Sequence, residues 1–180
     1  MKTFLKIIQS SGVFPKTKFK KPKKYKNRET VKAIVTNQRG EVALVTNNKH
    51  KMYLLPGGGA ESKDLESEII RECLEEINYK VKVLGVVGKT REFRDRDEKK
   101  YTTTCFLAQA IKKVKKDLRT DDEKKYDLKM LWVPQGKLKK IFDSQKAKLD
   151  AGKVKFYNIS FNIVRDRIFI NEWLKTRKIP

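Results

Sequence analysis

Histidine and cysteine are scarce in this sequence, and long apolar runs are missing. His50 is the only histidine, and Cys73 and Cys105 are the only cysteines. A zinc site built from cysteine and histidine needs three or four such ligands at suitable spacing, so that class of site is excluded. Ser-His or Cys-His catalysis could be built only on His50. No apolar run approaches the roughly 20 residues that cross a bilayer, because even residues 4–8 are interrupted by Lys6. We therefore expect no membrane-spanning segment.

Both cysteines lie in apolar runs, Cys73 after Ile70 and Cys105 before Phe106. A reduced thiol in such a place packs as a small hydrophobe. The N-terminus starts with a basic residue but lacks the apolar core of roughly 7–15 residues that a signal peptide needs. These features predict a cytoplasmic protein.

Positive charge is what the sequence has in excess. Its 180 residues include 44 Lys plus Arg against 22 Asp plus Glu, which gives a formal net charge of +22. The densest basic stretch is residues 16–28, which contain no acid and carry Phe19 and Tyr25 between the basic side chains. This stretch could bind a polyanion such as RNA, or it could simply reflect the lysine-rich composition of the whole chain. An acidic substrate would be attracted in either case at low salt.

The length fits one domain, and the pattern changes near residue 30. We predict a basic N-terminal extension over residues 1–28 and a single domain with a C-terminal helix over residues 29–180. Apolar runs predict strands at residues 31–35 and 41–45, joined as an antiparallel hairpin, and further strands at 52–55, 81–87, 101–111 and 130–133. Helices are predicted at 64–77, from 135 to about 149, and at 159–174, and the charged residues 89–100 are predicted to form a loop. This mixture favours an α+β fold over a Rossmann-like parallel sheet.

The predicted helix over residues 64–77 carries four acids on one side. Glu68, Glu75 and Glu76 fall within about 60° of Glu72 around the helix axis, and the apolar residues occupy the other side. Carboxylates four residues apart repel one another, so a cation is expected among them. Clustered carboxylates are hard oxygen ligands suited to Mg²⁺ or Mn²⁺. The alternative is an ordinary solvated acidic face.

A glycine-rich turn precedes this helix. The run of residues 52–55 stops at Pro56, and Gly57, Gly58 and Gly59 follow. Three glycines expose backbone carbonyls and amides, which together with nearby carboxylates would form a cradle for a metal ion and a phosphate. Alone the triple glycine indicates only a loop, but its position about a dozen residues ahead of Arg71 makes the pattern specific.

These residues resemble the signature of the Nudix hydrolase family, the MutT-like domain. Its box reads Gly, five residues, Glu, seven residues, Arg-Glu, an aliphatic residue, any residue, Glu-Glu, any residue, Gly and an aliphatic residue. The match is close over residues 71–76, which read Arg-Glu-Cys-Leu-Glu-Glu, and the likeness extends loosely over residues 30–149. The resemblance implies a Nudix-type α/β/α sandwich with a mixed, largely antiparallel sheet.

The resemblance also implies roles for individual residues. The implied ligands of Mg²⁺, with Mn²⁺ as the alternative, are Glu72, Glu75, Glu76 and the carbonyl group of Gly57. The implied catalytic residues are Glu76, Glu75, Arg71, which would orient a carboxylate, and Glu123. For the general base, Asp121 and Asp122 are alternatives to Glu76 and Glu123. The implied substrate contacts are Gly58, Gly59, Arg91 and Arg94, although the arginines could instead belong to a solvated hairpin tip.

The sequence departs from the family pattern in two places. The first glutamate of the box falls on Lys63 when counted from Gly57, and on Asp64 when counted from Gly58, so the loop is one residue short. We expect Asp64 or Glu61 to brace the loop against the helix instead. The late glycine of the box is Asn78, which also tolerates the left-handed conformation that ends a helix.

Three functions remain open at this stage. The first is a nucleotide pyrophosphatase that cleaves a phosphoanhydride bond in a small nucleotide, a nucleoside diphosphate linked to another group. The second is a pyrophosphohydrolase that acts on RNA 5′ ends, which the basic stretch favours. The third is a non-catalytic Nudix-fold module that binds nucleotide or RNA, which the shortened loop favours.

Overall fold

The computed structural model describes residues 4–115 and 117–176. In chain order the elements are β1 (Phe4–Gln9), α1 (Ser10–Val13), β2 (Lys26–Thr36), β3 (Glu41–Thr46), α2 (Leu65–Ile77), β4 (Tyr79–Arg94), the 3-10 turn η1 (Asp95–Asp97), β5 (Lys99–Lys113), α3 (Asp121–Lys125), β6 (Lys129–Pro134), α4 (Gln135–Asp150) and α5 (Tyr157–Thr176). The predicted helices at 64–77, 135–149 and 159–174 correspond to α2, α4 and α5.

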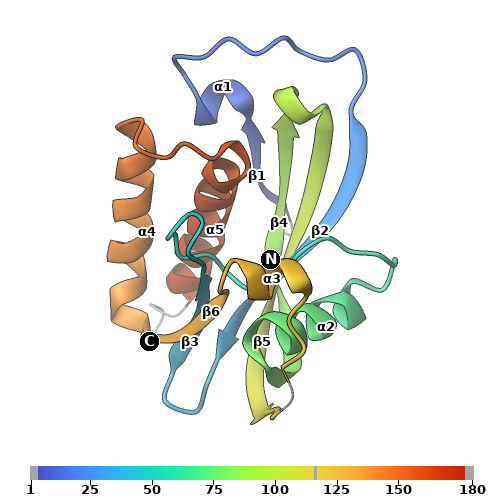
Figure 1. Cartoon of the computed structure of the whole chain (residues 1–180), viewed down its shortest axis with the longest axis vertical. Coiled ribbons are helices and arrows are strands. Elements are labelled where there is room, and N and C mark those ends of the chain that lie inside the picture. Colours follow the sequence, from blue (N-terminus) through green and yellow to red (C-terminus); the bar gives the residue numbers. More distant parts are fainter. Residues whose placement is uncertain (1–3, 116, 177–180) are drawn as a thin grey trace.

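The strands form one six-stranded sheet in the order β1-β4-β5-β2-β3-β6. The β2/β3, β3/β6 and β4/β5 pairs are antiparallel, and the β1/β4 and β2/β5 pairs are parallel. The predicted α+β class and the predicted β2/β3 hairpin are therefore confirmed. Figure 1 shows the sheet between α2 on one side and α4 with α5 on the other.

Alternate side chains of β2 explain this sandwich, because successive strand residues point to opposite faces. Val31 and Ala33 share a core cluster with Ile69 of α2. Ile34 belongs to a second cluster with Phe142 of α4 and Phe169 of α5. The central strand is thus covered on both faces, and its buried residues include the polar or charged Thr30, Lys32 and Thr36.

The prediction of a loop over residues 89–100 was wrong. β4 continues to Arg94 and β5 begins at Lys99, so that only η1 and Glu98 connect them. The prediction took charged side chains as a sign of an exposed loop. Two of them are instead buried in the strand and pair with each other, because Arg94 donates from Nε to Glu92 Oε2 over 2.9 Å. The isolated strand predicted at 52–55 is also reduced to a single bridge between Leu54 and Val45.

Residues of the predicted N-terminal extension contribute to the sheet. β1 pairs in parallel with β4, from Phe4 opposite Lys89 to Gln9 opposite Phe93. Just after β1, the Ser10 hydroxyl lies 3.1 Å from the Tyr157 hydroxyl at the start of α5. These contacts fix β1 as an edge strand beside the longest strand of the sheet.

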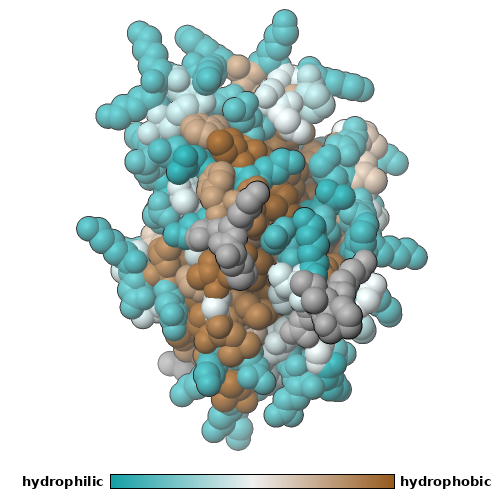
Figure 2. All heavy atoms as spheres, turned by 180° about the vertical axis from the view of Figure 1, so that it is seen from behind, coloured by the Kyte–Doolittle hydropathy of each residue, from teal (hydrophilic) through white to brown (hydrophobic). Residues whose placement is uncertain are grey.

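The surface is apolar in the middle of one face and hydrophilic around it. Figure 2 shows apolar side chains gathered down the centre of the rear face and long hydrophilic side chains projecting from its rim. Large apolar side chains that remain exposed come mainly from the strands, and they include Phe4, Ile7, Leu84, Val86, Ile111 and Leu131. Among the described residues, no helix is long and apolar enough to cross a membrane.

The glycine-rich loop fills a gap in the sheet. β2 and β3 are in register only at Thr36 and Val42, and the chain after Leu54 enters between them. On the β2 side, the Val31 amide donates to the Gly58 carbonyl and the Ala33 amide donates to the Pro56 carbonyl, both over 3.0 Å. The loop therefore takes the hydrogen bonds that a neighbouring strand would otherwise make.

A buried charge network anchors the start of this loop to the helical layer. Asp166 of α5 accepts the Leu55 amide over 2.9 Å and the Arg165 Nε group over 2.9 Å. Arg165 also reaches Glu92 of β4, with 3.4 Å between Nη1 and Oε1. Gln145 of α4 holds the neighbouring residue, because its side chain bonds both the amide and the carbonyl of Tyr53.

Removing Asp166 should destabilise the fold strongly. Asp166→Ala leaves the Arg165 charge under-compensated and the Leu55 amide without its acceptor, and breaking such a buried pair costs about 3–5 kcal/mol. Urea unfolding followed by circular dichroism measures this loss. Asp150→Ala removes an exposed carboxylate paired with Lys146 and should cost less than about 0.5 kcal/mol. Equal losses in the two variants would contradict the anchoring role.

Candidate active site

The ends of α2 are set by local sequence. The Asp64 side chain accepts the Ser67 amide over 3.1 Å and caps the N-terminus. Asn78 ends the helix in the left-handed conformation, with φ of 56°, which asparagine tolerates better than most residues. Because Ile69 and Cys73 face the sheet, the acidic side of the helix turns toward the glycine-rich loop.

Arg71 binds three carboxylates of the same helix at once. Its Nη1 group donates to Glu75 over 2.8 Å, and its Nη2 group donates to Glu68 over 2.9 Å and to Glu72 over 2.8 Å. Burial alone would lower the pKa of Arg71, but these carboxylates raise it above its usual value. A planar guanidinium can serve several acceptors in this way, whereas a lysine ammonium is a point charge. The orienting role predicted for Arg71 is consistent with these contacts.

Glu68 supplies the brace that we expected from Asp64 or Glu61. Its Oε1 atom accepts the Ser62 amide over 3.1 Å, and its other oxygen binds Arg71. Asp64 is used as the helix cap instead, and Glu61 contributes its backbone to Glu68 rather than its side chain. Because the loop is one residue short, the bracing acid comes from the first turn of the helix, a position that the family pattern does not mark.

Gly57 and Gly58 are required by close approach of the backbone. Gly57 has φ of 124°, and a Cβ atom there would lie 2.3 Å from the Val31 carbonyl oxygen. A Cβ atom at Gly58 would lie 2.7 Å from the Glu72 carboxylate. The Gly57 amide donates to Glu76 Oε2 over 2.6 Å. These contacts bring the loop backbone against two of the predicted metal ligands.

Lys32 is a site residue that the sequence analysis missed. Its Nζ atom donates to the Leu55 carbonyl over 2.9 Å and also to the Gly57 carbonyl. The residue is only 7% exposed. In a chain so rich in lysine, a single lysine on a strand carries no distinctive signal. The one available clue was its position between Val31 and Ala33 in an otherwise apolar run over residues 31–35.

The acidic groups at the loop are short of positive charge. Burial raises the pKa of Glu76 to about 8; Lys32 opposes this shift, and the charges of Glu72 and Glu123 add to it. Burial also raises the pKa of Glu72, against the opposing charges of Arg71 and Lys32. A carboxylate held away from water favours its charged form when a cation approaches it or when donors hydrogen-bond to it.

The donor chemistry of this region fits a divalent metal ion. Within residues 4–115 and 117–176, no three carboxylate, histidine or cysteine side chains converge closely enough to enclose an ion as they stand. Arg71 instead holds two of the predicted ligands, Glu72 and Glu75. The available donors are nevertheless carboxylate and carbonyl oxygens, which Mg²⁺ prefers. Burial is the largest cause of the raised pKa of Glu76, and a nearby cation would oppose that shift.

Among the three acids of α3, Glu123 is the one whose charge acts on Glu76. It also forms a capping box with Thr120, whose amide donates to Glu123 Oε2 over 2.6 Å. Asp121 and Asp122 lie in the first turn of α3 and are exposed. The structure therefore brings Glu123 toward the carboxylates of α2 more directly than its two neighbours.

The two predicted substrate arginines lie on β4, Arg91 within the strand and Arg94 at its last position before η1. Arg94 is buried, pairs with Glu92, and donates from Nη1 to the Asn158 side chain over 2.9 Å. Its guanidinium lies 4.1 Å from the centre of the Tyr101 ring. Arg91 is partly buried, with its guanidinium 5.6 Å from the centre of the Phe4 ring.

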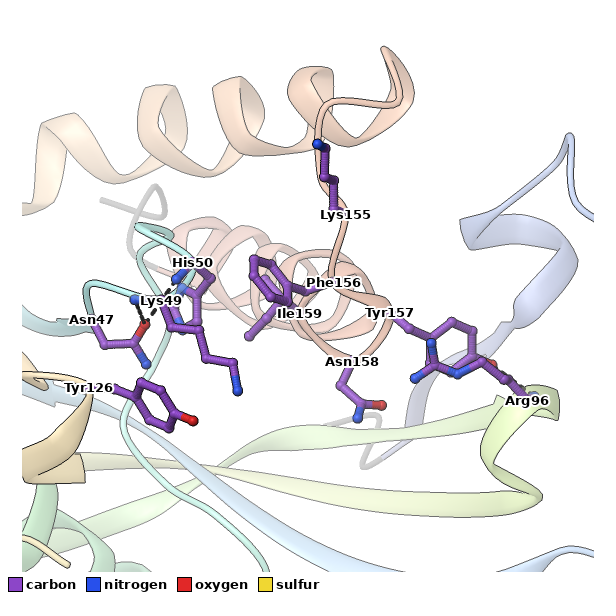
Figure 3. A pocket seen from close by; sticks show the side chains of 10 residues that line it. All are labelled: Asn47, Lys49, His50, Arg96, Tyr126, Lys155, Phe156, Tyr157, Asn158 and Ile159. Atoms are coloured by element: carbon purple, nitrogen blue, oxygen red, sulfur yellow. Dashed lines mark hydrogen bonds between the residues drawn. The ribbon is translucent and has the colours of Figure 1, made fainter. Parts of the chain in front are cut away.

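A cavity of about 440 Å³ opens between the loop after β3, the segment after α3 and the N-terminus of α5. Figure 3 shows Asn47, His50 and Tyr126 on one side, with Asn158 and Tyr157 coming from α5. Its volume lies within the usual range of ligand pockets, roughly 300–1,000 Å³. Tyr126 follows α3 directly, so the segment that carries Glu123 also forms a wall of this cavity.

His50 presents a neutral ring at this cavity. Burial lowers its pKa, and the charge of Lys49 lowers it further. Its Nδ1 atom accepts the Met52 amide over 3.0 Å, which leaves Nε2 as the protonated nitrogen of a neutral ring.

Comparison with known proteins agrees with this geometry. The NUDIX domain family matches residues 26–157. No curated protein matches the chain. Similar solved structures include a NUDIX hydrolase from Nitrosomonas europaea, with a TM-score of 0.54 and 18% identity, covering 74% of this chain and 95% of that chain. Another is the MutT protein from Methanosarcina mazei Go1, with a TM-score of 0.50 and 19% identity, covering 73% of this chain and 98% of that chain. At such identities the likeness shows the fold.

Adding a methyl group at Gly57 should disturb the loop itself. Gly57→Ala places a Cβ atom 2.3 Å from the Val31 carbonyl oxygen at a φ of 124°, and this kind of overpacking costs at least about 1–3 kcal/mol. Gly136→Ala is the matched control, because a Cβ atom there meets nothing within 4 Å. That variant should be neutral or more stable by up to about 1 kcal/mol. Urea unfolding of the metal-free chains makes the comparison, and a neutral Gly57→Ala would contradict the contact.

The raised pKa of Glu76 predicts a specific pH dependence in the metal-free chain. Because the folded-state pKa, about 8, exceeds the unfolded value, folding favours the protonated acid. Stability is therefore retained below the unfolded pKa and lost as pH rises toward 8, by up to about 1.4 kcal/mol per pH unit. Glu76→Gln should remove this slope. Urea unfolding in chelator from pH 4 to 9 tests it, and parallel curves for the two proteins would contradict it.

Proposed function

Because the chain belongs to the Nudix hydrolase family, we propose that it is a metal-dependent hydrolase that cleaves a phosphoanhydride bond in a small nucleotide. The proposed substrate is a nucleoside diphosphate linked to a further group. The observation that carries the proposal is the placement of α2 carboxylates, short of positive charge, against the backbone of the glycine-rich loop. Hydrolysis of such a bond needs a site that binds cations beside the phosphates.

Four groups would hold the metal ion, Mg²⁺ with Mn²⁺ as the alternative: the carboxylates of Glu72, Glu75 and Glu76 and the Gly57 carbonyl. When bound, a divalent ion neutralises phosphate charge and makes water a better nucleophile at neutral pH. Arg71 would keep the ligand carboxylates oriented while they exchange between its guanidinium and the ion.

The cavity would bind the nucleoside part. Tyr126 and Phe156 offer aromatic faces for a base, and Asn47 and Asn158 offer amide groups for its edges. Ligand pockets are usually lined by apolar and aromatic side chains, with a few polar groups that fix the orientation of the ligand. Tyr126 lines the cavity and follows Glu123 by three residues, and Glu123 is close enough to act on Glu76, so the phosphates of a bound nucleoside would extend past Tyr126 toward α2.

The other residues predicted to bind the substrate or to act as the general base would surround the bound nucleotide. The backbone of Gly58 and Gly59 would contact the phosphates. Glu123 and Glu76 remain the candidates for the general base. Arg94 would act on the substrate through Asn158, since its guanidinium is already engaged by buried partners. Arg91 remains a proposed direct contact.

One observation favours the second candidate, an RNA 5′ end as substrate. A hollow of about 630 Å³ next to Gly59 is lined by Lys26, Arg28 and Lys99 together with Tyr101. Basic side chains beside an aromatic ring suit a nucleic-acid strand. Activity on RNA would fall steeply between low and high salt, because polyanion binding releases counterions.

The test is Mg²⁺-dependent product release, resolved by ion-exchange chromatography, from a substrate panel. The panel contains nucleoside triphosphates, oxidised nucleotides, nucleoside-diphosphate sugars, dinucleoside polyphosphates and 5′-triphosphorylated RNA. Glu76→Gln should lower kcat by at least about 100-fold, because it removes a charged ligand of the metal ion that would neutralise the reacting phosphates. Glu66→Gln, an exposed change on the same helix, should keep full activity.

The outcomes separate the three functions. Turnover of a small nucleotide that disappears in Glu76→Gln supports the proposal. Turnover confined to RNA and steeply dependent on salt assigns the RNA 5′ end. Metal binding without turnover on any member of the panel would contradict an enzyme and leave a nucleotide-binding module.

A further inference from the structure

We propose that the Lys32 ammonium is a built-in cation of the site, which takes the place of a metal ion at the Gly57 carbonyl and keeps the loop closed when no metal is bound. The inference rests on the proposed metal site, and it assigns a positioning role to a residue that the family signature does not include. The argument comes from the partners, the burial and the charge balance of Lys32.

The partners of Lys32 are carbonyl oxygens, the kind of ligand that Mg²⁺ and Mn²⁺ also bind. Its ammonium donates to the carbonyl oxygens of Leu55 and Gly57, two residues apart in the same loop. Between them, Pro56 gives its carbonyl to the Ala33 amide of β2, as Gly58 does to the Val31 amide. Alternate carbonyls of the loop therefore bind the β2 backbone and the Lys32 side chain, so one strand fixes both sides of the loop.

Because Lys32 is buried, its ammonium group depends on protein partners rather than on water. At 7% exposure, an ammonium gives up most of its hydration and must be compensated by protein groups. Two carbonyl dipoles provide part of this compensation. Glu72 and Glu76 lie near enough that the charge of Lys32 lowers the pKa of both, against the larger effect of burial.

The charge balance explains why a cation is needed there. Four carboxylates cluster on α2, at Glu68, Glu72, Glu75 and Glu76, and Arg71 neutralises only one charge while bonding three of them. Glu76 lies outside that set and instead accepts the Gly57 amide. Lys32 thus supplies positive charge beside Glu76, the carboxylate outside the Arg71 set, whereas the Arg71 guanidinium reaches the loop at the Gly59 carbonyl, with 3.5 Å between Nη2 and that oxygen. Without it, repulsion and desolvation would push Glu76 and the loop apart.

The experiment compares Lys32→Met with Lys82→Met, which removes an exposed lysine from β4. In metal-free protein, hydrogen exchange at the Leu55 and Gly57 amides should accelerate at least tenfold in Lys32→Met and stay unchanged in Lys82→Met. Isothermal titration should then show Mn²⁺ binding roughly tenfold more tightly in Lys32→Met, because a competing charge is gone. Bound Mn²⁺ should restore the protection of both amides.

Unchanged exchange at both amides, or Mn²⁺ binding that is equal or weaker in Lys32→Met, would overturn the proposal. If Lys32→Met does not fold, Lys32→Gln provides the same comparison, since it keeps a donor for the carbonyls and loses the charge. Absence of Mn²⁺ binding in the unmodified chain would overturn the proposed metal site instead. The exchange comparison is made without metal, so it still decides the role of Lys32.

Discussion

The backbone of the glycine-rich loop, inserted between β2 and β3, is the constraint on which the rest of the site depends. Hydrogen bonds from Val31 and Ala33 hold it on the β2 side, and only glycine at position 57 allows so close an approach to Val31. α2 packs on the same strand through Ile69 and Cys73. The loop and the carboxylates are thereby placed against each other by the core of the protein, before any ligand binds.

Charge is balanced differently in the two layers beside the sheet. Between the sheet and α5, buried acids and bases pair with one another, as Arg165 does with Asp166 and Glu92. On α2, Arg71 alone serves three carboxylates, and the pKa of Glu76 stays high. The first arrangement stabilises the fold. The second leaves the carboxylates of α2 with too little positive charge beside them. A site that binds a metal ion next to a phosphate requires such carboxylates.

Much of this architecture could be predicted from the sequence. The helical spacing of Glu68, Glu72 and Glu76 and the glycines ahead of them located the site, because both patterns are local. The charged segment after residue 89 was misread, because the burial of Arg94 depends on Glu92 and on Asn158 from a distant helix. Lys32 was overlooked for the same reason: only the tertiary path of the loop turns a strand lysine into a site residue.

The central claim is that the loop and α2 together form a cation site. Anomalous diffraction from crystals soaked in Mn²⁺ tests it most directly. The account predicts an anomalous peak bonded to Glu76 and to at least one of Glu72 and Glu75, with that carboxylate released from Arg71. A peak elsewhere, or carboxylates that remain on Arg71 at saturating Mn²⁺, would contradict the account.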